Sequence, residues 1–176
     1  MNRRQLVKFA ALSGVAAIGA GYWALSAGEA LGALSLQGAQ QVLNGLQDKR
    51  LVSLKGWSPA EVFNHCAQSI EYSLGGYPAL KPAWFRHSVG PLAFSAFAAR
   101  GAMRHPLDEA IPGAAPLSAP TTQALALERL QQAFAAFASH QGELQPHFAY
   151  GALSHADYVQ AHVLHLYNHL SLIRLA

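Results

Sequence analysis

Residues 154–173 read SHADYVQAHVLHLYNHLSLI, and the spacing of this stretch predicts a helix with three histidines on its buried face. At 3.6 residues per turn, one side of the helix combines apolar residues and histidines: Tyr158, His162, His165, His169, Leu172 and Ile173. A neutral imidazole in an apolar interior needs partners for its ring nitrogens, and leaving one unpaired costs about 1–3 kcal/mol. The three rings therefore require either hydrogen-bond partners or a bound ion.

A metal ion is the functional interpretation of this spacing. His165 and His169 are four residues apart, so both imidazoles can reach one ion from the same face, as the histidines of an HExxH helix do. His162 and His169 are separated by about 10 Å along the axis, which is too far to share that ion. The alternative is a row of core or boundary histidines bonded to carbonyl groups and water. The spacing alone leaves both interpretations open.

Composition limits the classes of protein to consider. Of the 176 residues, 52% are hydrophobic and 12% charged, which excludes a disordered chain and predicts one domain with a large apolar core or a membrane-directed segment. The single cysteine, Cys66, excludes an intrachain disulfide and a thiolate metal cluster, and we interpret it as a small buried residue. Three of the twelve positive charges, Arg3, Arg4 and Lys8, lie at the N-terminus, leaving a neutral body that argues against nucleic-acid binding.

Residues 1–27 are typical of an export signal, with basic MNRRQLVK followed by a small-residue, weakly apolar stretch. Arg3 and Arg4, with Leu6 and Lys8 at the following offsets, resemble a twin-arginine (Tat) signal. We therefore expect a periplasmic protein whose partner during export is the Tat translocase. Residues 6–27 are then either removed or kept as an anchor in the inner membrane. An ordinary membrane helix is the alternative, which the many glycines and alanines disfavour.

The rest of the chain predicts an all-α bundle of four helices with no sheet. The first begins near Leu36, covers about 14 residues and is weakened by Gly38 and Gly45. The third extends from residue 121 or 122 to about 140, with apolar residues at helical spacing. The fourth is the histidine helix, with Ser154 as N-cap and Asp157 at the third helical position.

The second helix has the clearest start in the sequence, WSPAEV. Ser58 is the expected N-cap of a capping box with Glu61, Trp57 and Val62 are placed as a hydrophobic staple, and the helix stops at Gly75 and Gly76. An inward stripe follows from helical spacing: Val62, Cys66, Ile70 and Ser73. His65 lies at the flank of that stripe, within reach of a neighbouring helix.

Residues 77–120 form an irregular segment, called the arm below, with seven prolines and several aromatic residues. One short helix is expected from Pro91 to Arg100. A long connection of this kind in a compact domain is often a lid or a crossover. The alternative is a segment that only covers the core.

Together these features resemble the DinB-like or YfiT-like superfamily of four-helix bundles, closest to domain of unknown function 1569, over roughly residues 35–174. The resemblance is carried by the helix WSPAEVFNH, the arm, the loop PHFAYGALS and the final H-x3-H helix. It implies that His65, His165 and His169 bind a divalent metal, such as zinc, nickel or iron. Three protein ligands leave a coordination position open for chemistry. His147 and His162 are second candidates, as outer-shell partners or substrate contacts.

The resemblance does not specify a reaction. Several relatives use the metal to activate a low-molecular-weight thiol, so we expect a metal-dependent transferase or hydrolase acting on an unknown small molecule. The alternative is a non-catalytic envelope protein that binds a metal, a ligand or a partner, with a homodimer as a further option. No carboxylate lies within the histidine helix as a general base, which disfavours a metallopeptidase, and Asp157 is expected to be a cap. The chain departs from many relatives at Asn168 and at residues 170–172.

Overall fold

The computed structural model describes residues 32–117 and 122–176. The predicted signal, with Arg3, Arg4 and the stretch 6–27, lies outside the described residues, and so it stays a prediction. Within the described ranges, none of the helices combines the length and the apolar character needed to cross a bilayer.

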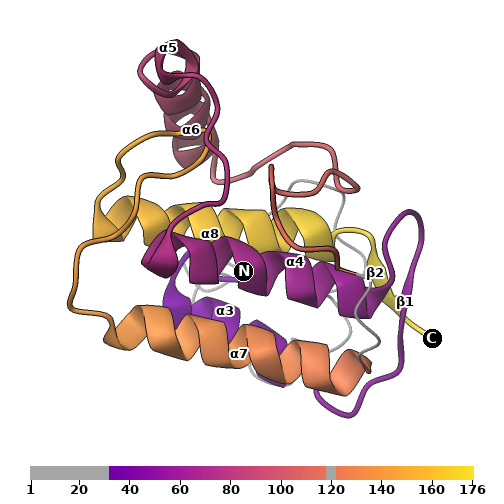
Figure 1. Cartoon of the computed structure of the whole chain (residues 1–176). Helices are drawn as coiled ribbons and strands as arrows, with labels where there is room; N and C mark the ends of the chain where they lie inside the picture. The colour runs from indigo at the N-terminus through magenta and orange to yellow at the C-terminus, as the bar shows by residue number, and fades with distance from the viewer. Residues whose placement is uncertain (1–31, 118–121) are drawn as a thin grey trace, which may run out of the picture.

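Most of the described chain is helical, as predicted. The body consists of four helices that contact one another: α3 (Leu36–Asn44), α4 (Pro59–Gly75), α7 (Gln123–Ser139) and α8 (His155–Leu170). Figure 1 shows α4 between α7 and α8, and two further helices, α5 (Ala83–Arg86) and α6 (Val89–Arg100), that project away from the body. The core lies between the four main helices and is filled by large apolar side chains, including Phe63, Leu130, Phe134, Phe137, Tyr158 and Leu166.

Both histidine-bearing helices begin at the predicted capping boxes. The Ser58 hydroxyl accepts from the Glu61 backbone N–H, and the Glu61 carboxylate accepts from the Ser58 N–H at 2.7 Å. Ser154 and Asp157 repeat the arrangement, with a distance of 3.1 Å from the Ser154 N to the Asp157 carboxylate. Because each cap sets the first turn, it also sets the face on which the later histidines lie.

The absence of a sheet was a wrong prediction. Strands β1 (Leu51–Ser53) and β2 (Ile173–Leu175) pair antiparallel, with Ser53 opposite Ile173. Helix α8 ends at Leu170. Ile173, which was expected on the buried face of that helix, is buried as a residue of β2. Three-residue strands are too short to show alternation, and the pairing joins two segments far apart in sequence.

The first helix is also shorter than expected, at 9 residues instead of about 14. Gly38 is better explained by packing than as a weak point, because a Cβ at this position would overlap the carbonyl oxygen of Ala33. The predicted inward stripe of α4 is buried, and Cys66 lies in it as a free thiol whose pKa is raised by burial.

The arm packs closely against the loop that precedes α8. A Cβ on Gly90 of α6 would overlap the carbonyl oxygen of Ala149, so helix and loop touch through their backbones. Gly151 has a φ of 79°, and a Cβ there would lie 2.6 Å from the carbonyl oxygen of Arg86. The helix expected from Pro91 begins two residues earlier, at Val89.

Candidate metal centre

The three predicted ligands meet between α4 and α8. His65 comes from α4, while His165 and His169 come from α8, and each ring offers a nitrogen within 4.8 Å of the other two. The ring centroids are 4.9 Å apart for His65 and His165 and 4.7 Å apart for the two other pairs. Two imidazoles that bind one ion through metal–nitrogen bonds of about 2.1 Å have centroids roughly 5 Å apart. The three rings are therefore spaced as ligands of a single ion would be.

The hydrogen bonding of these rings argues against ordinary core histidines. Among the described residues, Nδ1 of His65 and both ring nitrogens of His169 are buried without a partner. Nε2 of His65 lies 3.1 Å from Nε2 of His165, a contact within the cluster itself. Buried polar atoms without partners are rare because each costs about 1–3 kcal/mol. A metal ion would occupy the lone pairs that no protein donor reaches, so this donor set fits one.

Burial also keeps the three rings in the form that binds metals. Desolvation, with a smaller contribution from the neighbouring His105, lowers the pKa of His65 to about 4. The pKa values of His165 and His169 lie well below their ordinary value, again mainly because the rings are buried. All three imidazoles are thus neutral near pH 7, and a neutral imidazole is the metal-binding form.

Trp57 is part of the site, although the sequence indicated only a packing role on Val62. Its indole stacks on His169, with centroids 6.0 Å apart and an angle of 8° between the planes, and lies 4.8 Å from the ring of His65. The staple pattern accounted for this tryptophan, and no further signal connected it with histidines on α8. Trp57 covers one side of the centre with an apolar surface.

His105, on the arm, is a second residue that the sequence analysis missed. Its ring centroid lies 5.0 Å from that of His165 and 5.1 Å from that of His169. The arm has no helical period around this residue, so no face could be assigned to it. Four imidazoles therefore gather where three were expected.

His162, by contrast, is a satisfied core histidine. The Ser73 hydroxyl donates to the carbonyl of Ile70 at 2.6 Å, so it accepts from Nε2–H of His162 at 3.1 Å. Burial lowers the pKa of His162 to about 3. No hydrogen bond connects His162 to the three-histidine group, so the structure gives no sign of the outer-shell role considered for it.

His147 organises the loop before α8. Its Nδ1 accepts from the backbone N–H groups of Ala149 and Tyr150, each at 3.1 Å, and its ring stacks on Tyr150 with centroids 4.2 Å apart. Burial lowers the pKa of His147 to about 3. This histidine holds the loop that contacts Gly90 of the arm.

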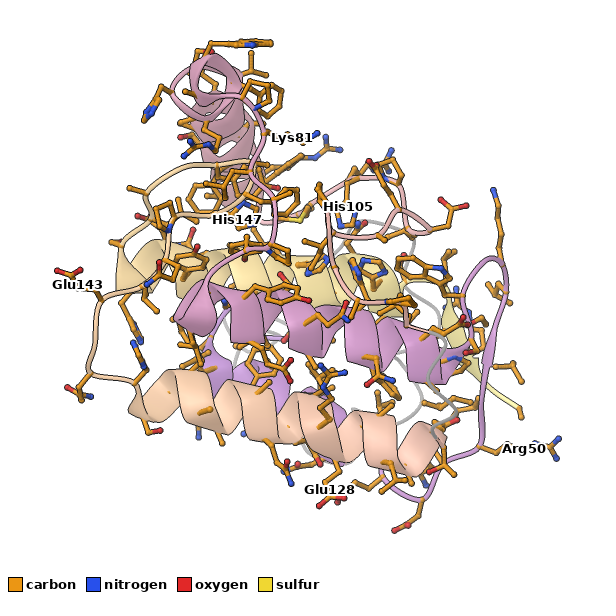
Figure 2. All side chains as sticks on the ribbon, viewed as in Figure 1. Arg50, Lys81, His105, Glu128, Glu143 and His147 are labelled. Atoms are coloured by element: carbon orange, nitrogen blue, oxygen red, sulfur yellow. The ribbon has the colours of Figure 1, made fainter. Side chains whose placement is uncertain are left out.

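A cavity of about 230 Å³ adjoins the three-histidine group. It lies between the arm, the loop before α8 and the two histidine helices, and Figure 2 shows Lys81, His105 and His147 around this region. Its wall combines polar and apolar side chains: His65, Ser69, Lys81, Met103, His105, Glu109, Ile111, His147, Phe148, Tyr150, His162 and His165. Two of the three clustered histidines thus face a space that can hold a small molecule.

Comparison with protein families identifies a family for this chain. A family model described as "Protein of unknown function (DUF1569)" matches residues 27–175, which include the whole cluster and the predicted domain of residues 35–174. No curated protein and no solved structure matches the chain.

Proposed function

The chain belongs to the DUF1569 family, whose function is unknown, and from this premise we propose that it is an exported metal-dependent enzyme that acts on a small molecule. The proposed ligands are His65, His165 and His169, and the proposed metals are zinc, nickel and iron. The reaction class is a group transfer, with a thiol as one candidate substrate, or a hydrolysis. The DinB-like relationship is part of the same proposal.

One observation supports the proposal: two of the three clustered, neutral histidines form part of the wall of a cavity. His65 and His165 line the cavity, and His65 retains a buried nitrogen without a partner among the described residues. A purely structural metal site is closed by four protein ligands, whereas a reactive one keeps a position open. A centre with two of its ligands in a cavity wall fits the reactive class.

The surrounding residues would supply the rest of the chemistry. A divalent ion bound at the three histidines would polarise a thiol, water or carbonyl group. Trp57 covers the rings of His65 and His169 and would keep water from that side. The carboxylate that is missing from the histidine helix is offered by Glu109 of the arm, which lines the cavity and can accept a proton from a bound molecule.

A second candidate, a non-catalytic envelope protein, is favoured by the outer surface of the arm. Trp84 is 66% exposed, Leu92 72% and Val89 46%, so α5 and α6 present apolar side chains to solvent. Exposed apolar surface of this kind is a feature of contact sites for partners. In this version the centre binds a metal or a ligand while the arm docks on a partner or on a second copy of the chain.

A metal and ligand titration distinguishes the two candidates. The purified protein is analysed for bound metal, reloaded with cobalt, and titrated with azide or a small thiol while its visible spectrum is recorded. An enzyme should show a spectrum that the added ligand changes, because a coordination position is accessible from the cavity. A metal-loaded protein whose spectrum neither ligand changes would support the non-catalytic version, and a chain that takes up no metal would overturn both metal-based versions.

Export by the Tat route is tested separately. Replacing Arg3 and Arg4 together by lysine should block translocation, because the receptor distinguishes a guanidinium pair from ammonium groups. Fractionation of cells that produce the wild type and the double variant measures the effect. Normal appearance of the double variant in the periplasm would refute Tat export.

A further inference from the structure

We infer that His105 is a fourth, arm-borne ligand of the metal centre and the one that an incoming small molecule displaces. The inference rests on the proposed function, since it concerns the same ion. It adds a residue from outside the helices that carry the three expected ligands.

The tautomer of His105 is suited to metal binding. Its Nδ1 lies 2.6 Å from the carbonyl oxygen of Pro106, and a carbonyl can only accept, so the ring proton is on Nδ1. Nε2 then carries the lone pair. This nitrogen is buried and has no hydrogen-bond partner among the described residues. A ring nitrogen fixed by a backbone carbonyl, with its other nitrogen free, is the usual arrangement of a histidine ligand.

The spacing of His105 matches that of the other rings. Its centroid separations from His165 and His169, 5.0 and 5.1 Å, agree with the roughly 5 Å expected for two imidazoles on one ion. His105 is nevertheless absent from the set of nitrogens that all lie within 4.8 Å of one another. It therefore stands beside the three-histidine group, and a small inward movement of the arm would complete a four-imidazole site.

His105 is kept in place by buried side chains and a hydrogen bond elsewhere on the arm, because no helix or strand contains it. Met103 and Ile111, 3% and 4% exposed, are buried on either side of it, and the Gln68 side chain donates to the carbonyl of Ala115 at 3.0 Å. No helix or strand covers residues 101–117. His65, His165 and His169, in contrast, are carried by helices of 16 or 17 residues. Of the four imidazoles, His105 is the one whose backbone can move without breaking a helix.

Movement of His105 would open the metal centre towards the cavity. His105 lines it together with His65 and His165, so a molecule in the cavity approaches the ion from the side of the arm. Four bound imidazoles would close a tetrahedral site, and a reaction requires that one of them leave. Displacement of His105 by a thiolate, carboxylate or similar donor would open the position while the helices keep the ion in place.

The test compares the wild type with His105→Ala, His105→Gln and the matched control His87→Ala. His87 is an exposed histidine on the same arm, between α5 and α6, and its removal controls for the loss of an imidazole. Each protein is loaded with zinc or cobalt, the number of imidazole ligands is counted by X-ray absorption, and azide is titrated into the cobalt form.

We expect four imidazoles in the wild type and the control, and three in both His105 variants. Azide should bind about 10-fold more tightly, or tighter still, to the His105 variants, because it no longer competes with a protein ligand. An unchanged imidazole count and azide affinity in a variant that still binds metal would overturn the inference while leaving the proposed function intact. A wild type that binds no metal would remove both.

Discussion

Histidines reach the same place from two regions that differ in structure. One region is the pair of helices α4 and α8, and the other is the arm. Each helix of the pair starts at a capping box and is largely buried, whereas neither α5 nor α6 has a side-chain hydrogen bond at its N-cap and both expose large apolar residues. Precise sites are built on elements whose rotamers and backbones are locked by packing. The helices thus fix the positions of three imidazoles, whereas the arm places His105 beside them on a segment without a helix or strand.

The largest expected effect is loss of the metal when a helix-borne ligand is removed. His65→Ala, His165→Ala and His169→Ala should each lose most of the affinity, because the two helix-borne imidazoles that remain, with only the arm-borne His105 beside them, would no longer hold an ion firmly. The wild type should gain roughly 3–4 kcal/mol of stability at 100 to 1,000 times the dissociation constant, and these variants little. Thermal unfolding with zinc, nickel or iron against chelator measures the shift.

His162→Ala is the matched control for this series, since it removes another buried histidine from α8, the helix that carries His165 and His169. Its hydrogen bond goes to Ser73 and not to the three-histidine group, so most of the metal-induced shift should be kept. Equal metal-induced shifts of thermal unfolding in the wild type and in His165→Ala would show that the clustered histidines are only core residues. The helices would then have no metal-binding role to set against the arm.

Acid should destabilise the metal-free protein through its buried histidines. The pKa values of His147 and His162 are about 3 in the folded protein against an ordinary value of 6.5, so the unfolded chain binds protons first. The stability these rings contribute is fully present above about pH 6.5 and falls as the pH decreases towards 3. Urea unfolding in chelator at several pH values should show this slope, and His162→Gln should reduce it. The same slope in the variant would contradict the burial of His162.

Gly90→Ala should disturb the arm without changing a ligand. The new Cβ would overlap the carbonyl oxygen of Ala149, and forcing atoms into a filled contact typically costs about 1–3 kcal/mol. The unfolding midpoint in denaturant measures the loss. Gly75→Ala is the control, because nothing lies within 4 Å of the added Cβ at that position. Similar losses for the two variants would show that the contact between α6 and the loop before α8 is not tight.

Removing a cap should have a smaller effect. Ser58→Ala and Ser154→Ala each delete a side chain that accepts from the third residue of the helix, and such substitutions cost about 1 kcal/mol. Denaturant unfolding of the metal-free protein measures the cost. Replacement by aspartate, which can also accept, should restore most of it, and failure of both replacements to change the midpoint would show that the caps contribute nothing.

The smallest effect is expected on the outer face of the arm. Leu92→Ser changes a side chain that is 72% exposed, so the free energy of unfolding should change by no more than about 0.5 kcal/mol. If the apolar face docks on a partner or a second copy, the same change should lower the sedimentation coefficient of a self-associating sample. A monomeric wild type would exclude the homodimer.

The helices and part of the site could be predicted because their signals are local. Ser58 with Glu61 and Ser154 with Asp157 are separated by three residues, and His165 and His169 by four, so helical geometry alone relates them. His65 required the resemblance as well, because its flank position is compatible with several neighbours. Cys66 was correctly expected to be buried, since it shares a face with apolar residues.

Local signals are therefore enough to predict the mainly helical character, the starts of α4 and α8 and the common face of His165 and His169, since each depends on residues within one or two turns. Four other features appear only when the chain is folded: the pairing of β1 with β2, the stacking of Trp57 on His169, the bond from His162 to Ser73 and the approach of His105. Each of these contacts joins segments distant in sequence. Their partners are selected by how helices and arm pack together, and no local period encodes that packing.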